Sequence, residues 1–162
     1  MNRFSLFVAA VSLAVLALIG CESLPKKPAT VVYTYENNGS PVEVTVLNTS
    51  AKRKTKEPSS CTVTLCANPT TGYSWSYRLN PDKVMKMTDE KYVQDKKDAR
   101  DVGTGGKQYY VFTPQKQGIA DAILTYSRPW EKTKSDQKIR IKFKIDKNRD
   151  IYVQDVILGT EN

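Results

Sequence analysis

The chain has 162 residues and a formal net charge of +8, from 25 Lys and Arg against 17 Asp and Glu, and it contains no histidine. The length suits a single domain with one core. The absence of histidine removes the most common general base and metal ligand, which excludes hydrolases that activate a serine or cysteine through histidine. The positive charge favours anionic partners, but the lysines are scattered, so a solvated basic surface is the simpler interpretation.

The N-terminus has the pattern of an export signal. Arg3 precedes an apolar run, Phe4 to Ile19, which ends at Leu18-Ile19-Gly20-Cys21. The run is shorter than the roughly 20 residues of a membrane-spanning helix, and a small residue before cysteine fits cleavage at that point. Because the motif resembles the bacterial lipobox, we expect a signal peptide over residues 1–20 and lipidation of Cys21. An uncleaved anchor helix is the alternative.

Lipidation of this kind would attach palmitate or a related acyl chain and hold the protein on a membrane outside the cytoplasm. A nucleic-acid partner is not expected in the cell envelope. Residues 21–30 contain two prolines and no apolar periodicity, which predicts a tether. We therefore expect one globular domain over residues 31–162.

Strand patterns fill the domain. Apolar residues alternate with polar ones, or follow turn residues, over 31–35, 42–46, 61–65, 84–87, 91–94, 108–113, 120–126, 139–145 and 151–158. Turn residues punctuate these segments, residues 49–60 form a basic loop, and no segment has a convincing helical period. The sequence predicts an all-β protein, an antiparallel sandwich of about eight strands.

Two cysteines lie within one predicted strand. Five steps of extended chain place the Cα atoms of Cys61 and Cys66 about 16 Å apart, beyond the roughly 7 Å limit for a disulfide. They are therefore expected to be small buried or half-buried residues, with an intermolecular bridge as the alternative.

The first unusual loop is NPTTGYSW, Asn68 to Trp75. Pro69 fixes its own φ, the β-branched Thr70 and Thr71 have few rotamers, and Gly72 can adopt a positive φ, so the loop should be stiff. Two aromatic residues, Tyr73 and Trp75, follow on the next strand and can face inward to hold the base of the loop. Such a loop loses little entropy on binding.

Two further loops carry binding features. The glycine-rich segment Gly103, Thr104, Gly105 and Gly106 leaves the backbone bare, which favours close approach of another chain, although a flexible turn is equally compatible. Arg128, Pro129 and Trp130 end a later strand. An exposed tryptophan on a rigid loop is typical of an interface anchor, and the alternative is an indole folded over the sandwich edge.

These three motifs, in this order and between strands, resemble the three signature loops of the chagasin family of cysteine peptidase inhibitors. The resemblance implies an immunoglobulin-like sandwich whose loops gather at one end and enter the cleft of a papain-like peptidase. By this analogy Thr70, Thr71 and Gly72 lie at the catalytic centre, Gly103 to Gly106 follow the substrate groove, and Trp130 packs on aromatic surface, with Arg128 adding a charged contact.

The resemblance implies reversible, non-covalent inhibition by a monomer, and neither a catalytic residue, a metal nor a cofactor is expected. The basic loop 49–60, the lipid anchor and the segment after Asp146 lie outside the family pattern. Two alternatives remain open: an immunoglobulin-like envelope lipoprotein that uses the same loops for adhesion or assembly, and a catalytically active envelope enzyme.

Overall fold

The structure of the protein is a computed structural model that describes residues 29–37, 39–49, 58–95, 103–131, 133 and 136–160. The expected signal peptide, Cys21 and the tether up to residue 28 lie outside the described residues, and so do residues 50–57 of the basic loop. Within the described ranges, no helix is both long and apolar enough to cross a lipid bilayer.

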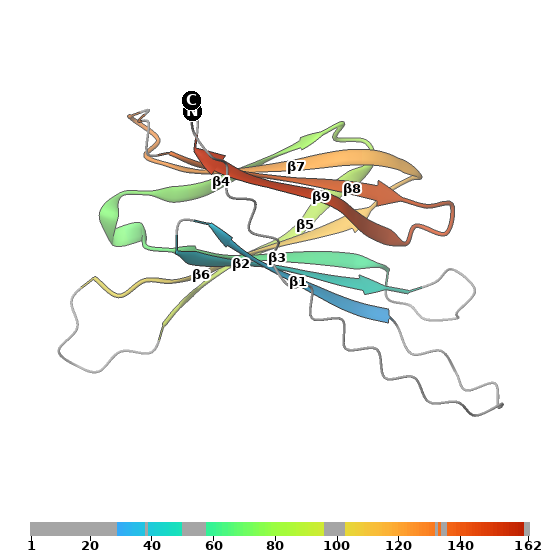
Figure 1. Cartoon of the computed structure of the whole chain (residues 1–162), viewed down its shortest axis with the longest axis horizontal. Coiled ribbons are helices and arrows are strands. Elements are labelled where there is room, and N and C mark those ends of the chain that lie inside the picture. Colours follow the sequence, from blue (N-terminus) through green and yellow to red (C-terminus); the bar gives the residue numbers. More distant parts are fainter. Residues whose placement is uncertain are drawn as a thin grey trace, which may run out of the picture.

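The described residues form nine strands in two antiparallel sheets, which face each other as the layers of a sandwich (Figure 1). One sheet has the strand order β1-β2-β3-β6-β5 and the other β4-β7-β8-β9. The strands are β1 (Ala29–Asn37), β2 (Ser40–Asn48), β3 (Ser60–Ala67), β4 (Ser74–Asn80), β5 (Met85–Gln94), β6 (Gly106–Pro114), β7 (Gly118–Ser127), β8 (Gln137–Ile145) and β9 (Ile151–Thr160). Between β3 and β4 the chain forms a short 3-10 turn, η1 (Pro69–Thr71).

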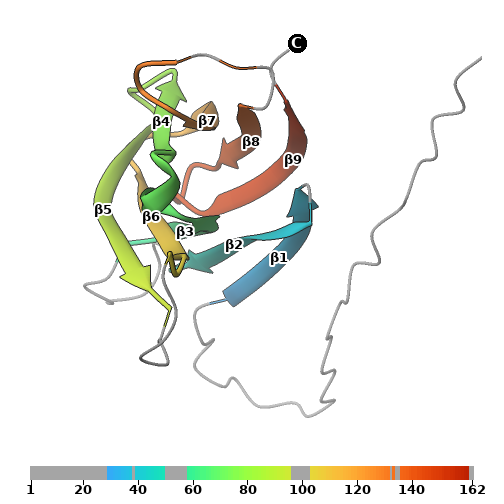
Figure 2. The ribbon, with the colours of Figure 1, turned by 90° about the vertical axis from the view of Figure 1, so that its left-hand side faces the viewer.

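The topology is that of an immunoglobulin domain. When the seven strands from β2 to β8 are lettered A to G, they pair as A-B-E-D in one sheet and C-F-G in the other, the order of a constant-type domain. β1 and β9 each add one edge strand (Figure 2). The predicted antiparallel, immunoglobulin-like sandwich is confirmed, with nine strands in place of about eight.

The core follows from strict alternation along the central strands. Burial alternates residue by residue along β3, whose Cys61, Val63 and Leu65 point inward. The second sheet covers these side chains with alternate residues of β7 and β8. Each fully buried aliphatic or aromatic side chain stabilises the fold by roughly 1.5 to 3 kcal/mol. The largest fully buried side chains are Tyr110, Phe112, Phe143, Leu65, Met85, Leu124, Ile139 and Ile141.

One strand prediction was wrong. Residues 84–87 and 91–94 were expected as two short strands, because the intervening Thr88, Asp89 and Glu90 are polar. The structure continues them as the single strand β5, which pairs with β6 across a register shift between Met87 and Asp89. β5 is an edge strand, exposed over most of its length, so no apolar alternation marks it.

The two sheets are joined along one flank, where β2 meets β9. The side chain of Asn48 donates from Nδ2 to the Ile151 carbonyl (2.8 Å) and accepts from the Ile151 N–H at Oδ1 (2.7 Å). Nearby, the Ser59 hydroxyl donates to the buried carboxylate of Asp150 (3.1 Å). Asn48 thus pairs with β9 as a backbone unit would and links β2, the neighbour of the edge strand β1, to the edge strand of the other sheet.

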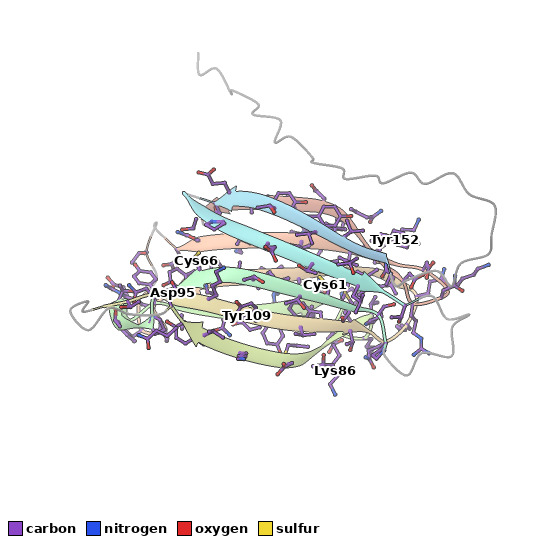
Figure 3. The ribbon with its side chains drawn as sticks, turned by 90° about the horizontal axis from the view of Figure 1, so that it is seen from below. Cys61, Cys66, Lys86, Asp95, Tyr109 and Tyr152 are labelled. Atoms are coloured by element: carbon purple, nitrogen blue, oxygen red, sulfur yellow. The ribbon has the colours of Figure 1, made fainter. Side chains whose placement is uncertain are left out.

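Antiparallel order sends alternate connections to opposite ends of the sandwich. The β1–β2, β3–β4, β5–β6 and β7–β8 connections lie at one end, the left in Figure 1, which we call the loop end. The first residue of β1 and the β6–β7 and β8–β9 turns lie at the opposite end, which we call the base. Figure 3 shows the same separation, with Cys66 and Asp95 toward the loop end and Lys86 and Tyr152 toward the base.

Among the described residues Cys61 and Cys66 form no disulfide with each other, and Cys61 is buried and Cys66 half-buried, as predicted. Burial raises the pKa of the Cys61 thiol far above its ordinary value. Since the thiolate is the reactive form, Cys61 is expected not to react with a disulfide reagent at pH 8 until urea unfolds the domain. The measurement uses a variant with Cys21→Ser and Cys66→Ser, so that Cys61 gives the only signal. Rapid labelling of the native variant would contradict the buried position.

Candidate functional site

The first loop is a 3-10 turn held by its own side chains. The Asn68 Oδ1 accepts hydrogen bonds from the Thr70 backbone N–H (3.3 Å) and the Thr70 hydroxyl (2.6 Å). The Thr71 hydroxyl donates to the Asn68 carbonyl (2.7 Å). Gly72 then ends the turn with φ 79, and its N–H donates to the Pro69 carbonyl (3.0 Å). The loop is therefore stiff, as the sequence predicts, and Thr70 and Thr71 are exposed.

An aromatic cluster supports this loop from below. Tyr73 and Trp75 are half-buried, and their rings lie 5.3 and 5.0 Å from the ring of Tyr126 on β7. The predicted inward orientation of both residues therefore holds. Tyr126 itself was not singled out as a site residue from the sequence, because it continues the face of its strand that Ala120, Ala122 and Leu124 form and has no motif of its own.

Hydrogen bonds hold both the indole and the backbone of Trp75. Its Nε1 donates to the Cys66 carbonyl (2.8 Å), and the Tyr110 hydroxyl donates to the Trp75 carbonyl (2.9 Å). The pKa of Tyr110 is raised well above its ordinary value. Burial is the largest cause, and the nearby Glu90 carboxylate is the second. The Tyr110 phenol therefore remains a donor throughout the neutral pH range.

The first and second loops are joined through Asn68. Its backbone N–H donates to the Tyr126 hydroxyl (2.9 Å), and its Nδ2 donates to the Gly103 carbonyl (3.1 Å). A Cβ at position 103 would lie 3.7 Å from the Thr70 hydroxyl oxygen. One side chain thus shapes the first loop and also holds the start of the second loop beside it.

The backbone of the second loop is accessible to a partner only in part. Gly103 has φ 82 and is half-buried. Gly105 accepts at its carbonyl from the Asp95 N–H (3.0 Å), and a Cβ there would meet the Ala67 carbonyl oxygen at 3.1 Å. At buried Gly106, a Cβ would collide with the Val93 carbonyl oxygen of β5. The glycines at 105 and 106 therefore permit close packing within the domain itself.

The third loop is a tight turn closed by an ion pair. The Glu131 N–H donates to the Arg128 carbonyl (3.2 Å), and the Arg128 guanidinium meets the Glu131 carboxylate at 3.1 Å. The same guanidinium lies 4.8 Å from the centre of the Tyr73 ring. Arg128 is thus engaged inside the domain, and Glu131, which the sequence did not single out, is its partner. Pro129 is exposed, and Trp130 is 73% exposed.

The third loop also touches the first. A Cβ built on Gly72 would lie 3.0 Å from Cη2 and 3.1 Å from Cζ2 of the Trp130 indole, and 3.9 Å from Nε of Arg128. The indole edge therefore lies directly against the glycine that ends the 3-10 turn. Together with the Asn68 bridge, this contact gathers the three loops into one surface at the loop end.

The double role of Asn68 leads to a stability prediction. Asn68→Ala removes the acceptor for Thr70 and the donor to Gly103, and is expected to lower the free energy of unfolding by roughly 1 to 2 kcal/mol. Asn68→Asp keeps the acceptor and loses only the donor, so its loss should be smaller. Urea unfolding of the two variants beside the parent measures both. Equal stability of all three proteins would contradict the bridge.

The surface has the chemistry of binding. In the portion of the chain that the structure describes, no three His, Cys, Asp or Glu side chains are grouped to hold a metal ion. The exposed groups at the loop end include two threonines, two prolines and an indole on turns held by the domain's own contacts. Such preorganised turns fit insertion into a partner's cleft.

Comparison with known proteins agrees with this geometry. The model of a family described as the chagasin family peptidase inhibitors matches residues 54–145, which include all three loops. The chain belongs to this inhibitor family. Its match extends from the basic loop to the end of β8, so β1, β2 and β9 lie outside it.

Individual proteins resemble this chain at about the same level of sequence identity. Amoebiasin-1 of Entamoeba histolytica is 31% identical over 112 residues, which cover 69% of this chain and 96% of that protein. Chagasin of Trypanosoma cruzi is 32% identical over 72 residues, 42% of this chain and 64% of that protein. The crystal structure of a cysteine protease inhibitor from Entamoeba histolytica is 30% identical, covering 45% of this chain and 65% of that one, with a TM-score of 0.40.

Proposed function

We propose that the chain inhibits papain-like cysteine peptidases, reversibly and without covalent chemistry, by inserting its three loops into the active-site cleft. Membership of the chagasin family supports this proposal, since the family is described as one of peptidase inhibitors. The observation that carries it is the contact of Gly72 with Trp130 and of Asn68 with Gly103, because one cleft can receive the three loops only if they lie together.

In this proposal the 3-10 turn covers the catalytic cysteine of the peptidase. A substrate presents an extended peptide, whereas Thr70 and Thr71 lie in a closed turn whose Pro69 carbonyl accepts the Gly72 N–H. The turn therefore fills the centre without offering a carbonyl in attackable geometry. Gly103 to Gly106 lie along the substrate groove, and Trp130 packs on the leaving-group side.

The inhibitor acts as a monomer and performs no catalysis, so it requires neither a metal nor a cofactor. Its affinity comes from turns that are rigid before binding, since ordering flexible side chains would consume part of the interaction energy. The exposed Trp130 supplies the largest apolar contact at the loop end.

We further propose that Cys21 carries the lipid that holds the inhibitor on a membrane outside the cytoplasm. Support comes from the sequence, in which the apolar run ends at Leu18-Ile19-Gly20-Cys21. Growth of expressing bacteria with labelled palmitate should label the chain and leave a Cys21→Ser variant unlabelled. Equal labelling of both proteins would place the lipid elsewhere, and no labelling of either would end this part of the proposal.

A titration tests the inhibition. Increasing amounts of the chain from Glu22 onward are mixed with papain, and the residual hydrolysis of a peptide substrate is measured. Activity should fall to zero and return on dilution, whereas trypsin, a serine peptidase, should keep its activity. Full papain activity at micromolar protein would refute the proposed inhibition and favour the adhesion or assembly alternative.

A further inference from the structure

The base of the sandwich has a different character from the loop end. β1 begins there at Ala29, so the chain that leads back to Cys21 leaves the domain at the base. The eight Cα to Cα steps from Cys21 to Ala29 span at most about 28 Å. If Cys21 carries a lipid, the base is the part of the domain that lies nearest to the membrane.

Basic side chains project from the turns at the base. Lys116 in the β6–β7 turn and Lys147 and Arg149 in the β8–β9 turn are exposed, and Lys144 at the end of β8 is exposed beside them. The β4–β5 turn also lies at the base. Its two exposed charged residues in the described chain, Asp82 and Lys83, have opposite charges and cancel.

The acidic side chains of the β8–β9 turn are directed into hydrogen bonds. The Asp146 Oδ1 accepts from the backbone N–H groups of Asn148 (2.8 Å) and Asp150 (2.9 Å). The buried carboxylate of Asp150 accepts from the Ser59 hydroxyl (3.1 Å). Because these carboxylates face the domain while the lysines and the arginine face solvent, the turn presents positive charge outward.

Two exposed apolar side chains lie next to these cations. In the β7–β8–β9 register Lys144 stands opposite Ile119 on one side and Tyr152 on the other. Ile119 is 55% exposed and Tyr152 is 47% exposed. Exposed aliphatic and tyrosine side chains among cations are typical of surfaces that lie in a lipid headgroup region.

We propose that this surface, formed by Lys116, Ile119, Lys144, Lys147, Arg149 and Tyr152 and here called the basal patch, docks on anionic lipid headgroups. The inference rests on the proposed lipid on Cys21, which brings the base to the bilayer. The cations attract the headgroups, while Ile119 and Tyr152 enter the interface between them.

Docking of the basal patch would orient the inhibitor. Strands of ten residues, such as β7 and β9, span about 33 Å, so the loop end would stand roughly that far from the headgroups. The loops would then face outward, accessible to a peptidase in solution. A peptidase would meet the loop end rather than the bilayer.

The test uses the full lipidated chain reconstituted on vesicles of phosphatidylcholine alone or of an equal mixture with phosphatidylglycerol. Backbone hydrogen exchange is followed by mass spectrometry. On the anionic vesicles, exchange in residues 115–119 and 144–152 should be slowed, and about 1 M salt should remove the protection by screening. Equal exchange on both vesicle types would overturn the proposal.

Matched charge reversals locate the patch. The triple variant Lys116→Glu, Lys147→Glu and Arg149→Glu should lose the protection. Each cation removed is expected to weaken the binding of the patch to the anionic surface about fivefold. The control Arg78→Glu, Lys91→Glu and Lys107→Glu has the same net charge but changes exposed residues of β4, β5 and β6 outside the patch, and should keep it. Loss in both variants alike would overturn the assignment to the base.

Flotation separates this proposal from the lipid attachment on which it rests. Flotation with neutral vesicles reports the lipid on Cys21, because it needs no charge. Flotation with anionic vesicles alone would support the basal patch and refute the lipid, whereas failure on both vesicle types would overturn both proposals.

Discussion

Replacing Trp130 with alanine is expected to weaken inhibition of papain by roughly 30- to 1000-fold, which corresponds to about 2 to 4 kcal/mol of binding free energy. The indole is 73% exposed at the loop end, so its apolar area is available to a partner. For the same reason its removal should change the free energy of unfolding by only about 0.5 kcal/mol. The inhibition constant and the urea midpoint of the variant measure the two effects.

Tyr152→Ala is the matched control for Trp130→Ala. Tyr152 is also an exposed aromatic residue, at 47%, but it lies at the base. In solution, without vesicles, the control should inhibit papain as well as the parent does. If Trp130→Ala inhibits equally well, the indole is not an anchor for the peptidase.

Gly72→Ala is expected to weaken inhibition about tenfold or more, although it removes no side chain from the loops. Two effects combine at this residue. The positive φ of 79 costs a non-glycine residue about 1 to 2 kcal/mol, and the added Cβ would lie 3.0 Å from the Trp130 ring. The indole must therefore move away from the first loop. Titration of papain with the variant measures the loss of inhibition.

The chain offers a control that separates strain from contact. Gly39, in the β1–β2 turn, has φ 76, and a Cβ there would meet no atom within 4 Å. Gly39→Ala should therefore lose a similar amount of stability and yet inhibit papain fully. Similar weakening of inhibition in both glycine variants would mean that the Gly72 contact with Trp130 does not matter for binding.

The sequence was sufficient to predict a strand where one face of that strand is buried and the other is not. β3 and β8 alternate strictly, because their inward residues form the core and their outward residues do not. β5 was divided in two by prediction because an edge strand exposed over most of its length carries no such signal. The connection of the two sheets through Asn48 had no signal either, since one asparagine at the end of a strand equally suggests a turn.

The candidate site was predictable in its motifs but not in its internal contacts. Pro69, Thr70 and Gly72 indicate a stiff turn by their own conformational limits. The hydrogen bond from Asn68 to Gly103 joins residues 35 positions apart, which no local pattern reveals. A basic residue beside an exposed tryptophan suggested a contact with a partner, whereas the structure pairs Arg128 with Glu131.

The link between Asn48 and Ile151 makes the two flanks of the sandwich unequal. On the linked side, a side-chain amide carries two hydrogen bonds from one layer to the other. On the other side, the edge strands β4 and β5 are largely exposed to solvent. Thermal fluctuations should therefore separate the two sheets mainly at β4 and β5, while β2 and β9 stay together and act as the hinge.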